Sequence, residues 1–175
     1  MDGRDGAHRG LSRRNAARAP PLTGDGSPDG GGPARGDGNT MADQPPEVPG
    51  GPHLRTVAMP ADANAGGSVF GGWTLSQMDL AGGTFAAERA DGRVATVSIE
   101  AMRFLRPVAV GDEVSCYCSQ EKTGDTSVVV KVETWARGRG RGKAPEKVTE
   151  GVFTFVALDD EGKPRQSPKE DGARR

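Results

Sequence analysis

Hydrophobic and polar residues alternate along stretches of the second half of the chain. In 126–136, TSVVVKVETWA, three valines at every second position share one face, while Lys131 and Glu133 share the other. A two-residue period is typical of a strand with one buried face. Similar reasoning predicts further strands over 54–58, 93–105, 113–122 and 147–158. Turn residues separate the later ones, at Val110-Gly111-Asp112 and Thr123-Gly124-Asp125.

A helical period replaces the alternation in 71–90, GGWTLSQMDLAGGTFAAERA. An advance of about 100° per residue places one apolar stripe on Leu75, Met78, Gly82, Phe85 and Ala86. One long helix followed by four consecutive antiparallel strands predicts an α+β fold. Because the helix is apolar over much of its surface, we expect a curved antiparallel sheet of about five strands to wrap around it.

Asp79 falls inside this stripe, one turn after Leu75 and one turn before Gly83. Carboxylates are among the groups least often buried, because losing their hydration is costly without a partner. An acid on the inward face of a helix is therefore either paired with a cation or used in chemistry, and the alternative is that Asp79 lies only at the edge of the stripe.

The loop ahead of this helix, MPADANAGGSVFGG at 59–72, brings further polar groups to the helix start. Gly71 and Gly72 let a ligand or another backbone come close, and the first amides of the helix have no partner of their own. Such amides bind anions or stabilise an oxyanion. With the side-chain amide of Asn64 and the carboxylate of Asp79, this region has the groups needed to attack a carbonyl with water. The alternative is a tight helix start with two packing aromatics, Phe70 and Trp73.

Composition divides the 175-residue chain sharply. Residues 1–53 hold 8 of the 13 prolines and 12 of the 27 glycines, which predicts a disordered extension. This extension has no apolar run typical of a secretory signal, and Met41 would make an ordinary start of its own. Residues 54–168 suit one domain and 169–175 a disordered tail. A net charge of −1 disfavours a nucleic-acid binder, and the lack of 18 consecutive apolar residues disfavours a membrane protein.

Cysteine and histidine usage restricts the chemistry. Cys116 and Cys118 are two apart in a predicted strand, so we expect both thiols to be reduced and packed on one face of a cytoplasmic protein. The two histidines, His8 and His53, precede the predicted domain. A Ser-His-Asp or Cys-His pair is therefore not expected, and the chemistry would run on carboxylates, amides and water with no metal and no cofactor.

The segment between the last two strands, RGRGRGK at 137–143, interleaves four cations with glycines. It could be a solvated hairpin loop, an electrostatic clamp for a phosphorylated ligand, or an RNA-binding segment. The absence of aromatics and the near-neutral chain disfavour RNA.

Three blocks of sequence resemble the hotdog-fold acyl-CoA thioesterases, and among these the YciA-like bacterial branch. They are LRTVAMPADANAGGSVFGGWTLSQMD, RFLRPVAVGDEV and TEGVFTFVALDDEGKPR, starting at residues 54, 103 and 149. The block Asn-x-x-Gly-x-x-Phe-Gly-Gly-Trp through Met-Asp is the most specific. The resemblance covers about 54–168 and leaves the N-terminal extension unmatched.

This resemblance implies hydrolysis of acyl-coenzyme A to a free acid and coenzyme A. It implies that Asp79 is catalytic, as general base or nucleophile, that Asn64 positions substrate or water, and that amides at Gly71-Gly72 hold the thioester carbonyl. It also implies a homodimer, with Asn64 of one subunit facing Asp79 of the other, and further assembly into a trimer of dimers. The Arg-Gly loop departs from the family pattern.

Coenzyme binding is the least determined part of this prediction. Cations and a hydroxyl near strand ends and loops could meet its phosphates: Arg106, Lys122, Ser127 and Arg139. Met78, Met102 and Phe104 could line an acyl tunnel or only pack the core. The alternative function is a non-catalytic acyl-CoA-binding hotdog module, which the complete set of Asn64, Gly71-Gly72 and Asp79 disfavours.

Overall fold

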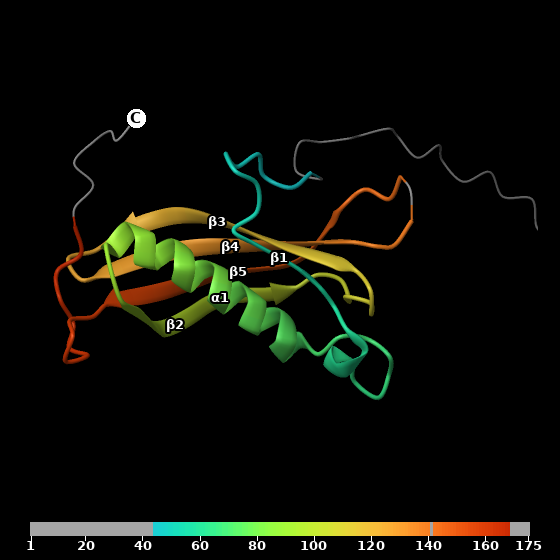
Figure 1. Cartoon of the computed structure of the whole chain (residues 1–175), viewed down its shortest axis with the longest axis horizontal. Coiled ribbons are helices and arrows are strands. Elements are labelled where there is room, and N and C mark those ends of the chain that lie inside the picture. The colour runs from blue at the N-terminus through green and yellow to red at the C-terminus, as the bar shows by residue number, and fades with distance from the viewer. Residues whose placement is uncertain (1–43, 141, 169–175) are drawn as a thin grey trace, which may run out of the picture. The chain divides into compact units, whose positions relative to one another are not determined.

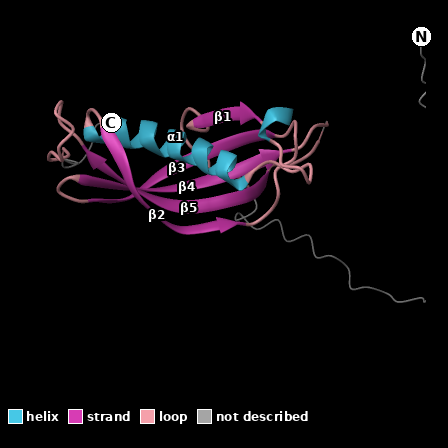
Figure 2. Ribbon diagram, turned by 90° about the horizontal axis from the view of Figure 1, so that it is seen from below, coloured by secondary structure: helices cyan, strands magenta, loops and turns pink. Residues whose placement is uncertain are grey.

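The computed structural model describes residues 44–140 and 142–168. One long helix, α1, lies across one face of a five-stranded antiparallel sheet of order β1-β3-β4-β5-β2 (Figure 1 and Figure 2). In chain order the elements are β1 (Leu54–Val57), the short helix η2 (Pro60–Asp62), α1 (Gly71–Ala90), β2 (Val94–Phe104), β3 (Glu113–Thr123), β4 (Ser127–Arg137) and β5 (Glu146–Ala157). Within these residues no helix is long and apolar enough to cross a membrane.

The predicted elements and fold class are confirmed. The helix has the predicted limits, and each strand agrees to within one residue at either end. In β4 the alternation of residues decides which side chains face the core. Val128, Val130 and Val132 point into it, and the residues between them are half-buried on the other face.

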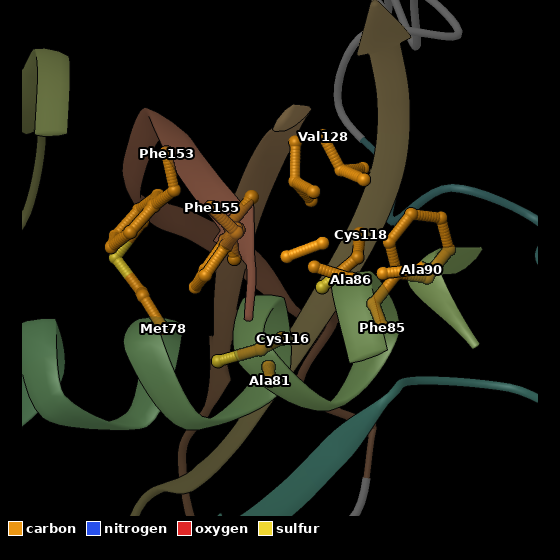
Figure 3. Packing of buried hydrophobic residues seen from close by; sticks show 13 residues of the cluster. Met78, Ala81, Phe85, Ala86, Ala90, Cys116, Cys118, Val128, Phe153 and Phe155 are labelled. Atoms are coloured by element: carbon orange, nitrogen blue, oxygen red, sulfur yellow. The ribbon is translucent and has the colours of Figure 1, made fainter. Parts of the chain in front are cut away.

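The core lies between α1 and the sheet. Met78, Ala81, Phe85 and Ala86 of the helix pack with buried side chains of β3, β4 and β5 (Figure 3). The helix lies very close to the sheet at Gly82, where an added Cβ would be 2.9 Å from Cζ of Phe155. A helix this near to the sheet requires a residue without a side chain at that position.

Both cysteines belong to this core. Cys116 and Cys118 are free and buried on the helix-facing side of β3, as predicted for packing residues. Burial raises the pKa of Cys116 to about 11 and that of Cys118 to about 12. The native thiols are therefore protonated at neutral pH.

The packed part of the chain begins before residue 54. The backbone N–H of His53 donates to the carbonyl of Cys116 at 2.9 Å, and its Nδ1 accepts from the N–H of Cys118 at 3.0 Å. Its ring meets the Phe85 ring edge-on, with 5.0 Å between the centroids. The expectation that both histidines lie outside the domain is therefore wrong for His53. Most of the predicted extension, 1–43, and the predicted tail, 169–175, lie outside the described residues.

His53 makes the stability of the fold depend on pH. Burial holds the pKa of its imidazole below the usual value, while the charge of Glu88 raises that pKa and the charge of Arg89 lowers it. The unfolded chain therefore takes up the proton first as the pH falls. The stability that neutral His53 contributes is complete above its unfolded pKa of about 6.5, and is lost as the pH falls through the lower folded value.

We expect the melting temperature to fall between about pH 8 and about pH 5.5, and His53→Gln to reduce this change, because glutamine can accept from Cys118 without titrating. Other charged groups line the same hollow as His53: Glu88, Arg89, Glu121, Lys122 and Asp125. Thermal melts of both proteins across this range make the comparison. An equal pH dependence in the variant would assign the effect to those groups instead.

Candidate active site

Asp79 lies at the edge of the buried helix stripe rather than inside it. Met78 and Ala81 are buried against the sheet, whereas Asp79 is half-buried and Leu80 is 59 % exposed. The sheet covers the face of α1 that carries Met78, and it leaves the flank above β2 open. The inward-facing position predicted for Asp79 is therefore wrong, and the alternative of an acid at the edge of the stripe is confirmed: Asp79 faces a groove.

Thr96 of β2 holds the carboxylate of Asp79. Its Oγ1 donates to Oδ1 of Asp79 at 2.6 Å. Thr96 pairs with Phe155 of β5 immediately before an irregularity in the register of β2. Sequence reasoning missed this residue, because a threonine in a strand carries no signal of a contact with a helix residue 17 positions earlier.

The groove between α1 and β2 has a volume of about 430 Å³. The helix contributes Asp79, Leu80, Gly83, Thr84 and Ala87, and the sheet side contributes Arg93, Val94, Thr96 and Phe155. Apart from Asp79, Thr96 and Arg93, this lining is apolar or small. A carboxylate therefore stands at one end of a mostly apolar channel.

The start of α1 presents free backbone donors. Gly71 and Gly72 are exposed, and their N–H groups have no hydrogen-bond acceptor among the described residues. Gly71 lines a second hollow of about 270 Å³ together with Thr74, Phe104 and Arg106. An anion or a carbonyl oxygen could approach these amides directly.

Asn64 lies in the loop ahead of α1, and its side chain bonds within that loop. Its Nδ2 donates to Oγ of Ser68 at 3.0 Å, and its Oδ1 accepts from the N–H of Gly66 at 2.8 Å. Neither Asn64 nor Gly71-Gly72 lines the groove of Asp79. One protomer therefore does not bring the predicted site residues together.

The predicted coenzyme contacts divide between the two ends of the sheet. Lys122 is the next-to-last residue of β3 and Ser127 begins β4 at the hairpin, whereas Arg139 follows β4 at the far end. There Nε of Arg139 donates to the carbonyl of Gly111 at 3.3 Å. Arg106 also lies at this far end, beside Gly71, and pairs with Glu146 at 2.9 Å.

The candidate tunnel residues and the Arg-Gly loop have other partners. Met78 is fully buried in the core, Met102 packs against the same core, and Phe104 lies next to Gly71. In the loop, Arg137 pairs with Glu113 at 3.0 Å, and Arg141 lies outside the described residues. At least two of its cations, Arg137 and Arg139, are thus engaged by the protein itself.

Residues 66–143 match the family model described as the thioesterase superfamily. The acyl-CoA thioester hydrolase YciA of Escherichia coli strain K12 is 52% identical over 119 residues, which cover 67% of this chain and 90% of that protein. A hexameric thioesterase of Yersinia pestis is similar in structure, with a TM-score of 0.63, 50% identity and coverage of 70% of this chain and 99% of that one.

A more distant structure is an acyl-CoA hydrolase of Staphylococcus aureus in complex with butyryl coenzyme A, coenzyme A and coenzyme A disulfide. It is 29% identical, with a TM-score of 0.61, and the match covers 66% of this chain and 70% of that one. The fold, the family match and an identity of about one half over nearly the whole of the E. coli relative agree. The chain belongs to the thioesterase superfamily, as a hotdog-fold acyl-CoA thioester hydrolase of the YciA-like branch.

Proposed function

We propose that this protein hydrolyses acyl-coenzyme A to a free acid and coenzyme A through the carboxylate of Asp79. The observation that carries this proposal is the pair formed by Asp79 and Thr96 at 2.6 Å, at one end of an apolar groove. The hydrogen bond fixes one carboxylate oxygen. The other can take a proton from water, as a general base, or attack the thioester carbonyl itself.

The oxyanion is stabilised by backbone amides at Gly71-Gly72, which carry the partial positive charge of the helix start. Asp79 lies seven positions after Gly72 in the helix, a rise of about 10 Å. Base and oxyanion donor must both lie within about 3 Å of the reacting atoms, and an aspartate side chain is too short to close that gap. A second copy of the chain therefore supplies the amides that act with Asp79.

The second copy pairs along β2. This strand is an edge of the sheet (Figure 2) and exposes Val97, Ile99 and Phe104, next to the exposed Leu80 of α1. A long unpaired edge strand that exposes large apolar side chains is normally covered by another chain. A two-fold pairing brings the partner's loop at Asn64 and its helix start toward Asp79. The hexameric state of the Yersinia relative supports further assembly as a trimer of dimers.

Structures of variants of the Staphylococcus relative support the choice of residue types. One variant has an aspartate replaced by alanine, and another, in complex with coenzyme A, has an asparagine replaced by alanine. In the present chain Asp79 and Asn64 are assigned these roles. For the coenzyme, Arg106 is the first candidate, because it lies beside the helix start. Lys122, Ser127 and Arg139 stay predictions.

The activity is tested by the release of thiol from acyl-CoAs of increasing chain length. Turnover supports the proposal. Tight binding of acyl-CoA without turnover would instead favour the non-catalytic binding module.

Removing the hydroxyl of Thr96 is expected to impair turnover without abolishing it. A hydrogen bond to a charged group contributes about 1.5–3 kcal/mol, so Thr96→Val should lower kcat by roughly 10- to 100-fold. Thr96→Ser keeps the donor and should restore most of the rate. Steady-state kinetics of both variants make the test, and a Thr96→Ser as slow as Thr96→Val would exclude the positioning role.

A further inference from the structure

The two adjacent glycines in the middle of α1 have different surroundings. An added Cβ at Gly82 would lie 2.9 Å from Cζ and 3.1 Å from Cε2 of Phe155, so packing against the sheet requires glycine there. An added Cβ at Gly83 would meet only Cε1 of Phe155, at an ordinary 3.6 Å. The packing of one protomer therefore leaves room for a side chain at Gly83, although glycine destabilises a helix interior relative to alanine.

Gly83 lies in the floor of the groove that begins at Asp79. Asp79, Gly83 and Ala87 follow one another at four-residue spacing along the groove face of α1, over a rise of about 12 Å. Beyond the carboxylate, this row therefore has either no side chain or a single methyl group. The groove therefore stays open along the helix from the carboxylate of Asp79 to Ala87.

Beyond Asp79 and Thr96, the polar side chains that line this groove are those of Thr84 and Arg93. The hydroxyl of Thr84 donates to the carbonyl of Leu80 at 2.9 Å, so it is already satisfied by the helix backbone. At the far end, Nη1 of Arg93 donates to the carbonyls of Asp159 and Asp160, at 3.5 and 3.3 Å. Because Thr84 is satisfied by the helix and Arg93 is exposed to water, a hydrocarbon chain can occupy the groove between Asp79 and Arg93 without burying an unsatisfied polar group.

We infer that Gly83 sets the length of acyl chain that this enzyme accepts, because its missing side chain keeps the groove open beyond the thioester. The inference rests on the proposed function and adds the acyl subsite to it. The thioester carbonyl lies at Asp79, and the acyl chain runs over Gly83 toward Ala87 and Val94. Phe155 forms the base of the channel. Short acyl groups end before Gly83, and longer ones pass over it.

Two variants fill the groove in steps, Gly83→Ala with a methyl group and Gly83→Leu with a larger side chain. Their kcat/KM values are measured on acetyl-, butyryl-, octanoyl- and dodecanoyl-CoA. Each methylene excluded from an apolar site lowers kcat/KM by about fourfold. Gly83→Leu should therefore lower octanoyl-CoA hydrolysis by roughly 100-fold relative to wild type, and acetyl-CoA hydrolysis by only a few fold. Gly83→Ala should give a smaller loss in the same direction, together with a higher melting temperature, because alanine favours the helix.

Glu88→Ala is the matched control. Glu88 is exposed on α1 and lines the hollow at His53 rather than this groove. The chain-length profile of the Glu88→Ala variant should therefore equal that of wild type. Equal losses by the Gly83 variants on all four substrates would overturn the inference. A change of the Gly83 variants from oligomer to monomer in light scattering would also overturn it, because that result would assign Gly83 to close contact between two copies.

Failure of the inference is separable from failure of the proposed function. An unchanged chain-length profile in Gly83→Leu, with wild-type hydrolysis intact, would remove the acyl subsite from Gly83 and leave the thioesterase in place. A wild-type protein that hydrolyses none of the four substrates would overturn both.

Discussion

Asp79→Asn is expected to lower kcat for acyl-CoA hydrolysis by about 10³-fold, within the range of 10² to 10⁴ that a positioned acid or base contributes. Asparagine has nearly the shape of aspartate, and its Oδ1 can still accept from Thr96. The fold and the groove should therefore be retained, while the carboxylate that is proposed to activate water or attack the carbonyl is lost. Thiol release measured on the purified variant and on wild type gives the comparison.

Asp91→Asn is the control for this substitution. Asp91 caps the other end of α1 with a φ of 50°, a conformation that asparagine also tolerates, and it does not line the groove. Its turnover should equal that of wild type. Unchanged turnover in Asp79→Asn would refute the catalytic role.

The two roles open to Asp79 leave different isotopic traces. If the carboxylate attacks the carbonyl, it forms an anhydride with the acyl group while the C–S bond breaks and coenzyme A leaves as its thiolate; water then cleaves the anhydride and releases the acid. A single turnover in water enriched in oxygen-18 would leave the label in Asp79 if that water attacks the aspartyl carbonyl. If the carboxylate only removes a proton from water, the label appears in the product acid alone.

Val97→Glu is expected to abolish oligomerisation and turnover together. Val97 lies on the free edge of β2 with 57% of its surface exposed, so the charge should be harmless to an isolated protomer. In the proposed dimer it would place a carboxylate in an apolar interface without a partner, which is costly. In the proposed site the second copy supplies the oxyanion donors, so the loss of rate should be at least about 10²-fold. Light scattering and thiol release on the same sample test both effects.

The same change at the opposite edge of the sheet separates edge pairing from a general effect of charge. Val57 of β1 is also exposed, at 44%, and Val57→Glu should keep the dimer and its turnover. An active, oligomeric Val97→Glu would contradict pairing along β2.

Secondary structure and fold class could be predicted because they follow from local patterns. The helix limits were predictable to the residue, since Gly71-Gly72 starts α1 and Asp91-Gly92 ends it in left-handed geometry. The strand faces followed from the two-residue period of the valines in β4. Recognition of the motif around Asp79 added the family and its chemistry.

The surroundings of the site could not be predicted from these patterns. Helical periodicity placed Asp79 beside Met78, but only the position of the sheet decides which flank of α1 is covered. The contacts of Thr96 with Asp79 and of His53 with Cys118 join residues 17 and 65 positions apart, with no local signal. Residue type alone groups Lys122 with Arg139 as candidate coenzyme contacts. The eleven-residue strands β3 and β4 place these two residues at opposite ends of the sheet.

The protonated state of the two core thiols has a practical consequence for assays of this enzyme. Thiol reagents react with the thiolate, and in the native protein Cys116 and Cys118 are both buried and protonated at neutral pH. A reagent that counts released coenzyme A therefore gives no background from the folded enzyme. The same two side chains become reactive when the helix leaves the sheet, so the rate of their labelling without substrate reports how often the core opens.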